Sequence, residues 1–167
     1  MQANKNYFLI LLDIFPKLSA SILIFIFANL IRVILTISNQ SWYLSLNKPF
    51  FILPDKFIEP IWLIIFLITG IAFYIVWQRG FDIKEVKLSL YTIIFALLIN
   101  LVGIGIFFGL EMILLGFLFS LFVIIILFLA FYRFFKVSKI ASILLVPYIV
   151  WIVYISFLQL GIFLLNS

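Results

Sequence analysis

Five long apolar stretches, each almost free of charge, constrain the fold of this chain more than any other feature. A helix needs roughly 20 mostly apolar residues to cross the hydrocarbon core of a bilayer, and the backbone inside that core must satisfy its own hydrogen bonds. We therefore predict an all-α integral membrane protein, a bundle of five transmembrane helices forming a single domain over residues 1–167. The predicted helices cover residues 17–37, 60–77, 88–108, 113–132 and 140–165, with a long loop over residues 38–59.

Basic residues stand mainly at the ends of these helices and predict an orientation. Of the 11 Lys and Arg residues, eight fall on the side shared by the N-terminus and the second and fourth loops, and three fall on the other side. Because cytoplasmic loops carry the excess of Lys and Arg, we predict a cytoplasmic N-terminus and an external 38–59 loop. The first residues contain no small-residue cleavage site, so we expect an uncleaved first helix and a bacterial inner membrane.

The residue types in the chain exclude several functions. There is no Cys and no His, which removes disulfides, zinc sites, a His-ligated haem and every nucleophile–His–acid arrangement. We therefore predict no metal site, no required cofactor and no catalytic residue of the ordinary kinds. The basic residues form no continuous stripe, so nucleic acid is not an expected partner.

Chemical information is concentrated in the proline-rich loop and in three helical stripes. Pro49, Pro54 and Pro60 stiffen the loop, because each residue before a proline favours an extended backbone. Aromatic and amide side chains then recur at helical spacing, and an aromatic pocket forms if the stripes converge. The stripes are Trp62, Phe66, Thr69 and Phe73; Ala96, Asn100, Gly103 and Phe107; and Tyr148, Trp151, Ile155 and Gln159.

Each of these residues also has a purely structural interpretation, which the sequence leaves open. Aromatic stripes in membrane helices often serve packing, and Asn100 can bond a neighbouring helix. Arg32 lies near a helix end, where we expect its guanidinium to extend to the interface, and we expect Glu59 to be solvated. Gly105 and Gly109 are spaced as a close helix-packing or dimer contact.

A specific combination of residues recurs at collinear spacing over residues 41–160. It consists of Trp42, Tyr43, Leu46, Lys48, Pro49, Pro54, Pro60, Trp62, Gly70, Ala72, Val76 and Trp77, then Leu90, Tyr91, Asn100 and 107–109, then 144–148 and Trp151. In these residues the chain resembles the translocator protein / tryptophan-rich sensory protein family (TspO/MBR), once called peripheral benzodiazepine receptors. The first helix agrees only in hydropathy.

The resemblance implies a five-helix bundle, commonly a homodimer, whose first long loop closes a pocket that binds porphyrins, sterols or benzodiazepine-like compounds. This sequence departs from the family at Gly103, where a Trp is usual, and at Ile155, where a small residue is usual. No Tyr or basic residue follows Tyr154, which favours a porphyrin over a sterol. By position, the ligand-binding residues would be Tyr43, Pro49, Trp62, Phe66, Asn100, Tyr148 and Trp151.

Three functions remain in view. The first is a membrane receptor or carrier that encloses a protoporphyrin-like tetrapyrrole, with Arg32, Lys48 or Lys56 as candidates to meet a propionate. The second is a light-dependent porphyrin-degrading enzyme in which Trp62 or Trp151 exchanges an electron with the excited ligand. The third is a regulatory partner protein that binds no ligand.

Overall fold

The computed structural model describes the backbone of residues 2–167 and the side chains of 15–54 and 56–167. Within that range every secondary structure element is a helix, and five segments are long and apolar enough to cross a membrane, which confirms the predicted fold class. The elements are α1 (Gln2–Ile37), α2 (Gln40–Ser45), α3 (Asp55–Trp77), α4 (Lys84–Ile104), η1 (Gly105–Gly109), α5 (Ile113–Val137), α6 (Lys139–Ile143) and α7 (Val146–Asn166).

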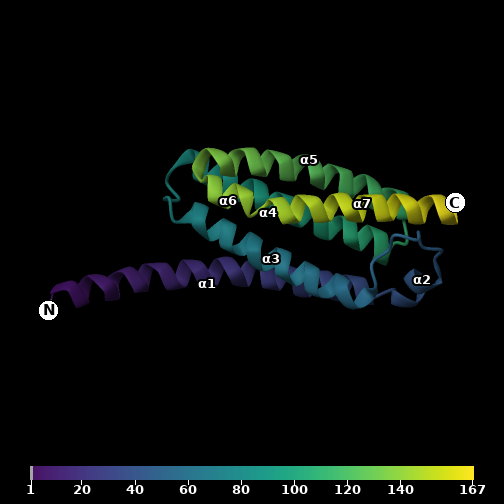
Figure 1. The fold of residues 1–167 in the computed structure, drawn as a ribbon, viewed down its shortest axis with the longest axis horizontal. Helices are drawn as coiled ribbons and strands as arrows, with labels where there is room; N and C mark the ends of the chain where they lie inside the picture. The colour runs from purple at the N-terminus through teal and green to yellow at the C-terminus, as the bar shows by residue number, and fades with distance from the viewer. Residues whose placement is uncertain (1) are drawn as a thin grey trace.

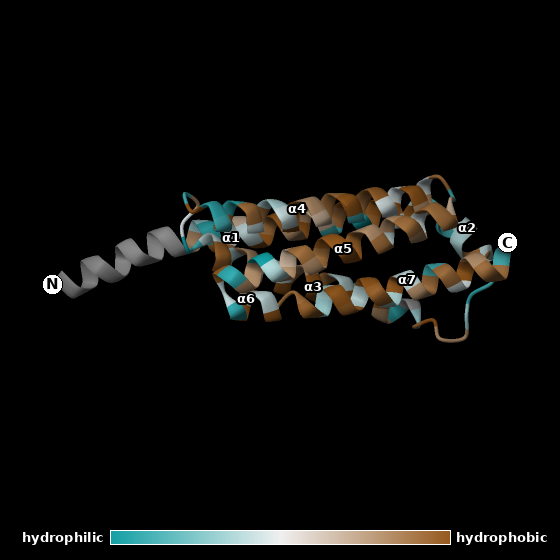
Figure 2. Cartoon of the chain, turned by 90° about the horizontal axis from the view of Figure 1, so that it is seen from above, coloured by the Kyte–Doolittle hydropathy of each residue, from teal (hydrophilic) through white to brown (hydrophobic). Residues whose placement is uncertain are grey.

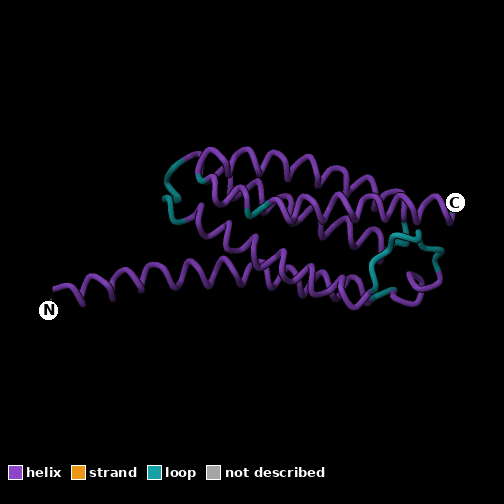
Figure 3. The backbone as a smooth tube through the Cα atoms, viewed as in Figure 1, coloured by secondary structure: helices purple, strands orange, loops and turns teal. Residues whose placement is uncertain are grey.

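The long helices run side by side (Figure 1), and their contacts close the bundle into a ring. Helix α1 packs on α3, α3 on α6 and α7, α7 on α5, α5 on α4, and α4 again on α1. Figure 3 shows the connections at the two ends of the bundle, with the segment that contains α2 beside the C-terminus. Hydrophobic residues run along the helices, and most of the hydrophilic ones gather toward the ends (Figure 2).

The predicted loop over 38–59 is shorter and more structured than expected. It contains the short helix α2, and α3 begins at Asp55 rather than at residue 60, so Pro60 lies inside α3. A proline is tolerated there because it falls near the start of the helix and removes a single backbone hydrogen bond. The earlier start places Glu59 on α3, where its side chain faces α1. Helix α1 likewise continues through Pro16, where we predicted a beginning.

Two predicted helices are interrupted. The one over 140–165 is divided into α6 and α7, and Pro147 stands in the first turn of α7. Proline is favoured there because the first N–H groups of a helix have no partner within it. The one over 88–108 ends in η1, a π-helical turn. A proline inside a helix removes a backbone hydrogen bond, so the sequence predicts a kink at Pro147 in the 140–165 helix. It also predicts a regular helix up to residue 108, where the structure has η1.

Two glycines illustrate the close approach of the elements. A Cβ added at Gly70 of α3 would lie 3.3 Å from the backbone of Ser21 and Ile22 in α1. A Cβ added at Gly116 of α5 would lie 2.8 Å from Cβ of Phe107 in η1. The absence of a side chain at these positions lets the ring close tightly around its aromatic core.

Candidate functional site

The three predicted stripes converge in the centre of the bundle. The Trp62 ring of α3 lies 5.4 Å from Phe66, 6.5 Å from Tyr148 and 6.0 Å from Trp151, centroid to centroid. From α4, the side-chain amide of Asn100 donates a 2.9 Å hydrogen bond to the hydroxyl oxygen of Tyr148. Most of the ring pairs meet edge to face, the arrangement that the aromatic quadrupole favours.

These side chains fill most of the space between them. Phe66 and Tyr148 are completely buried, and Trp62 and Trp151 nearly so. Asn100 borders only a small cavity of about 20 Å³ next to Trp62. Four of the predicted ligand-binding residues, Phe66, Asn100, Tyr148 and Trp151, therefore form packed support behind the larger cavity described next.

The larger cavity lies on the loop side of this cluster, between α1, α2, α3, the end of α4, η1 and α7. Its volume is about 180 Å³. Of the seven predicted ligand-binding residues, Tyr43 and Trp62 line this cavity. The other apolar lining residues are Leu44, Ile58, Ile104, Phe107, Phe108, Ile155, Leu158 and Ile162. The other polar ones are Arg32, Thr36, Gln40, Glu59 and Gln159.

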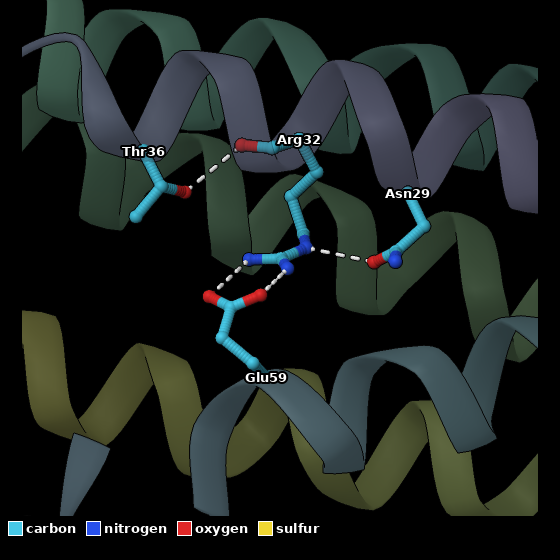
Figure 4. Close-up of polar contacts among 4 residues, drawn as sticks. All are labelled: Asn29, Arg32, Thr36 and Glu59. Atoms are coloured by element: carbon cyan, nitrogen blue, oxygen red, sulfur yellow. Dashed lines mark hydrogen bonds and ion pairs between the residues drawn. The ribbon is translucent and has the colours of Figure 1, made fainter. Parts of the chain in front are cut away.

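Arg32 is the main correction to the sequence analysis. Its side chain is 2% exposed and turns inward, not toward the interface. Nε donates to Asn29 Oδ1 at 3.0 Å, and the two terminal nitrogens donate to the two carboxylate oxygens of Glu59 (Figure 4). The guanidinium carbon lies 5.3 Å from the centre of the Trp62 ring. The expectation of an interfacial Arg32 was wrong. Glu59 is half exposed and also pairs with Arg32, which the sequence analysis did not foresee, because the early start of α3 brings Glu59 opposite α1.

Comparison with known proteins agrees with this architecture. The sequence pattern of the TspO/MBR family matches residues 20–165. The chain belongs to the TspO/MBR family. One relative, the tryptophan-rich protein TspO of Archaeoglobus fulgidus, is 36% identical over 80 residues, which are 47% of this chain and 50% of that protein. The alignment thus spans about half the length of the relative. Family membership and the five apolar helices together identify an integral membrane protein.

In this TspO/MBR protein the segment between α1 and α3, residues 38–54, covers the cavity as a lid attached to α7. The Leu53 amide donates to the Tyr154 hydroxyl at 2.9 Å. Asn47 and Asn166 exchange two 2.9 Å hydrogen bonds between backbone and side-chain groups. Pro49 lies against Gly161, where an added Cβ would be 3.0 Å from its Cγ. Pro49 thus positions the lid and is not among the residues that line the cavity.

The predicted glycine pair lies at the lid end of the bundle. A Cβ added at Gly105 would be 3.8 Å from Leu35 of α1, and one added at Gly109 would meet no atom within 4 Å. The closest approaches in the described chain occur at other glycines, Gly116 among them. The role of Gly105 and Gly109 in a dimer stays a prediction.

Sequence reasoning placed Phe107 and Gln159 on the inward stripes but did not include them among the ligand-binding residues. Phe107 lines the cavity from η1 and packs against Trp42 and Tyr43 of the lid. Gln159 is 9% exposed and lines both cavities, and its Oε1 has no hydrogen-bond partner in the described chain. A buried acceptor without a partner is costly, so Gln159 is a point at which a ligand donor could be bound.

Proposed function

We propose that this TspO/MBR protein is a membrane receptor or carrier that binds a porphyrin-type tetrapyrrole in the cavity beneath the lid. One observation carries the proposal: an apolar cavity is walled by the aromatic rings of Tyr43, Trp62, Phe107 and Phe108 and contains a few polar groups. Such a lining suits a flat, mostly apolar ring with polar edges. Binding of this kind requires no other cofactor.

The closed cavity is smaller than its proposed ligand. At about 180 Å³ it falls below the roughly 300–1,000 Å³ of pockets that enclose drug-sized ligands. Binding therefore requires the lid to move away from α7. The polar attachments of the lid to α7 are hydrogen bonds made with Tyr154, Leu165 and Asn166. Each contributes only about 1 kcal/mol net, so these hydrogen bonds present individually small barriers to opening.

The proposal is tested by titrating the purified protein with protoporphyrin IX in the dark and following the porphyrin absorbance band. This readout does not depend on tryptophan emission, so tryptophan variants can be compared directly. We expect saturable binding, weakened by up to about tenfold in Trp62→Phe, because the smaller phenyl ring loses part of an aromatic contact that contributes about 0.5–1.5 kcal/mol beyond its buried area. Trp77→Phe is the matched control, since Trp77 lies at the other end of α3 against Phe73.

Binding that does not saturate, or that both substitutions leave unchanged, would contradict the proposal. The latter result would favour the third function, a regulatory partner that works through protein contacts without this ligand.

A second candidate, light-dependent porphyrin breakdown, is supported by a continuous row of oxidisable rings. Trp62 lines the cavity, contacts Trp151 at 6.0 Å, and Trp151 stacks on Tyr154 at 5.2 Å. Such a row can pass an electron to an excited ligand and move the resulting hole away from the cavity. Illumination of the complex decides between the candidates: a spectral change that requires light and is lost in Trp151→Phe favours the enzyme, and an unchanged spectrum favours the receptor.

We also propose that the protein lies in a bacterial inner membrane as a homodimer, with a cytoplasmic N-terminus and an external lid. The chain contains no Cys, so a single introduced cysteine reports the orientation. A membrane-impermeant maleimide added to whole cells should label Ser45→Cys in α2 and not Asp82→Cys between α3 and α4. The opposite pattern would reverse the orientation. Cross-linking through a cysteine at Gly109 tests the dimer.

A further inference from the structure

Among the described side chains, Arg32 is the positively charged group that lines the cavity, and its contacts hold it in place. The other described basic residues toward the lid end of the bundle, Lys48 and Lys56, are not part of the cavity wall. Lys48 places its Nζ 4.2 Å from the Tyr43 ring centre, and Lys56 places its Nζ 5.1 Å from that of Phe57. The sequence left these three residues equivalent as anion-binding candidates, and the structure selects Arg32.

Arg32 is preorganised to bind a carboxylate. Asn29 holds Nε, the Trp62 ring lies beside the guanidinium, and the two terminal nitrogens form a fork around the Glu59 carboxylate. A guanidinium stays charged in proteins, and its planar fork matches a carboxylate in a two-point contact. The geometry around Arg32 is therefore that of a carboxylate-binding site already occupied by a carboxylate of the same chain.

The two members of this pair differ in how readily they can leave it. The Arg32 side chain is 2% exposed, whereas that of Glu59 is 50% exposed. Removing a carboxylate from a buried arginine without a replacement is strongly unfavourable, because it leaves an unpaired buried charge. Glu59 can turn into water, and it stands five residues after Pro54, where the lid ends. Glu59 can therefore leave Arg32 when the lid moves.

We propose that Arg32 determines specificity by binding a carboxylate of the ligand, and that Glu59 is an internal substitute which the ligand carboxylate displaces. This inference rests on the proposed function and narrows its ligand class to aromatic macrocycles that carry a free carboxylate. The exchange replaces one carboxylate by another, so the buried guanidinium stays neutralised throughout. The ring of the ligand then lies along Trp62, the residue that adjoins the guanidinium.

The test compares protoporphyrin IX, which has two free propionates, with its dimethyl ester. The readout is the Kd of the ester divided by the Kd of the acid. In the wild-type protein we expect the acid to bind about tenfold more tightly than the ester. A hydrogen bond to a charged group contributes about 1.5–3 kcal/mol, and the lower value corresponds to about tenfold in Kd. Arg32→Gln should reduce the ratio to about one. Glu59→Gln should raise the ratio, toward roughly 100-fold, because the competing carboxylate is gone.

Lys48→Gln is the matched control, because it removes the same charge from the same end of the bundle without changing the cavity wall. We expect it to leave the ratio as in the wild type. If Arg32→Gln fails to fold, the wild-type ratio and its change in Glu59→Gln still decide the question. Equal Kd values for the acid and the ester, in the wild type and in Glu59→Gln, would overturn the role of Arg32 while leaving tetrapyrrole binding intact. Absence of binding by either porphyrin would instead overturn the proposed function.

Discussion

The contact between Gly116 and Phe107 offers a direct test of how α5 supports the cavity wall. Gly116 is buried on α5, and Phe107 is buried in η1. A Cβ added at Gly116 would lie 2.8 Å from Cβ of Phe107 and 3.0 Å from its Cδ2. Real Cβ atoms do not approach so closely, and the near atom of Phe107 is attached directly to the backbone. Gly116→Ala must therefore move either η1 or α5.

The size of the effect follows from two opposing terms. Overpacking of a tight core costs about 1–3 kcal/mol, and alanine in place of glycine inside a helix returns about 0.8–1 kcal/mol. The expected net destabilisation is thus about 1 kcal/mol. For a chain of this size, that corresponds to a lowering of Tm by about 2–4 °C. Because Phe107 also packs on Trp42 and Tyr43 of the lid, protoporphyrin binding should weaken as well.

The assay is thermal unfolding in detergent followed by circular dichroism, with Gly109→Ala as the matched control. Gly109 ends η1, its φ is not in the left-handed region, and a Cβ there would meet no atom within 4 Å. We expect the control to keep the wild-type Tm within about 1 °C, as for a surface substitution of up to ~0.5 kcal/mol. An equal Tm for the two variants, or a higher one for Gly116→Ala, would refute this account of η1 packing.

Two further predictions concern the cavity and its lid. Gln159→Leu should raise the Tm of the ligand-free protein, because it removes the buried Oε1 that lacks a hydrogen-bond partner. A lower Tm would contradict this and would mean that the amide oxygen is already hydrogen-bonded. Tyr154→Phe removes the hydroxyl that accepts a hydrogen bond from the Leu53 amide and should speed hydrogen exchange of that amide about fivefold, from a net loss of about 1 kcal/mol. The exposed Tyr91→Phe is its control, and unchanged exchange would mean that other contacts hold the lid.

Some local features of the fold followed from the sequence without reference to packing. The five spans could be read from hydropathy because the bilayer allows only structures that satisfy their own backbone. Pro147 predicted a kink because its missing N–H acts on its own helix, and the structure there divides the helix into α6 and α7. The residues around Trp62, Asn100 and Trp151 predicted a shared interior because helical spacing places each stripe on one face.

The arrangement around the cavity depends on contacts between helices, and only the tertiary structure decided it. Arg32 and Glu59 are 27 residues apart and pair because of where α3 begins and how it is rotated against α1. The π-helical turn η1 brings Phe107 into the cavity wall. No local sequence pattern predicted this turn. By itself, the sequence determined the number of spanning helices and the inward faces of the aromatic stripes, since both depend on local hydropathy and helical spacing. Which inward side chains pack and which leave a cavity depended on helix rotation and close approach, since these are set by all the helices together.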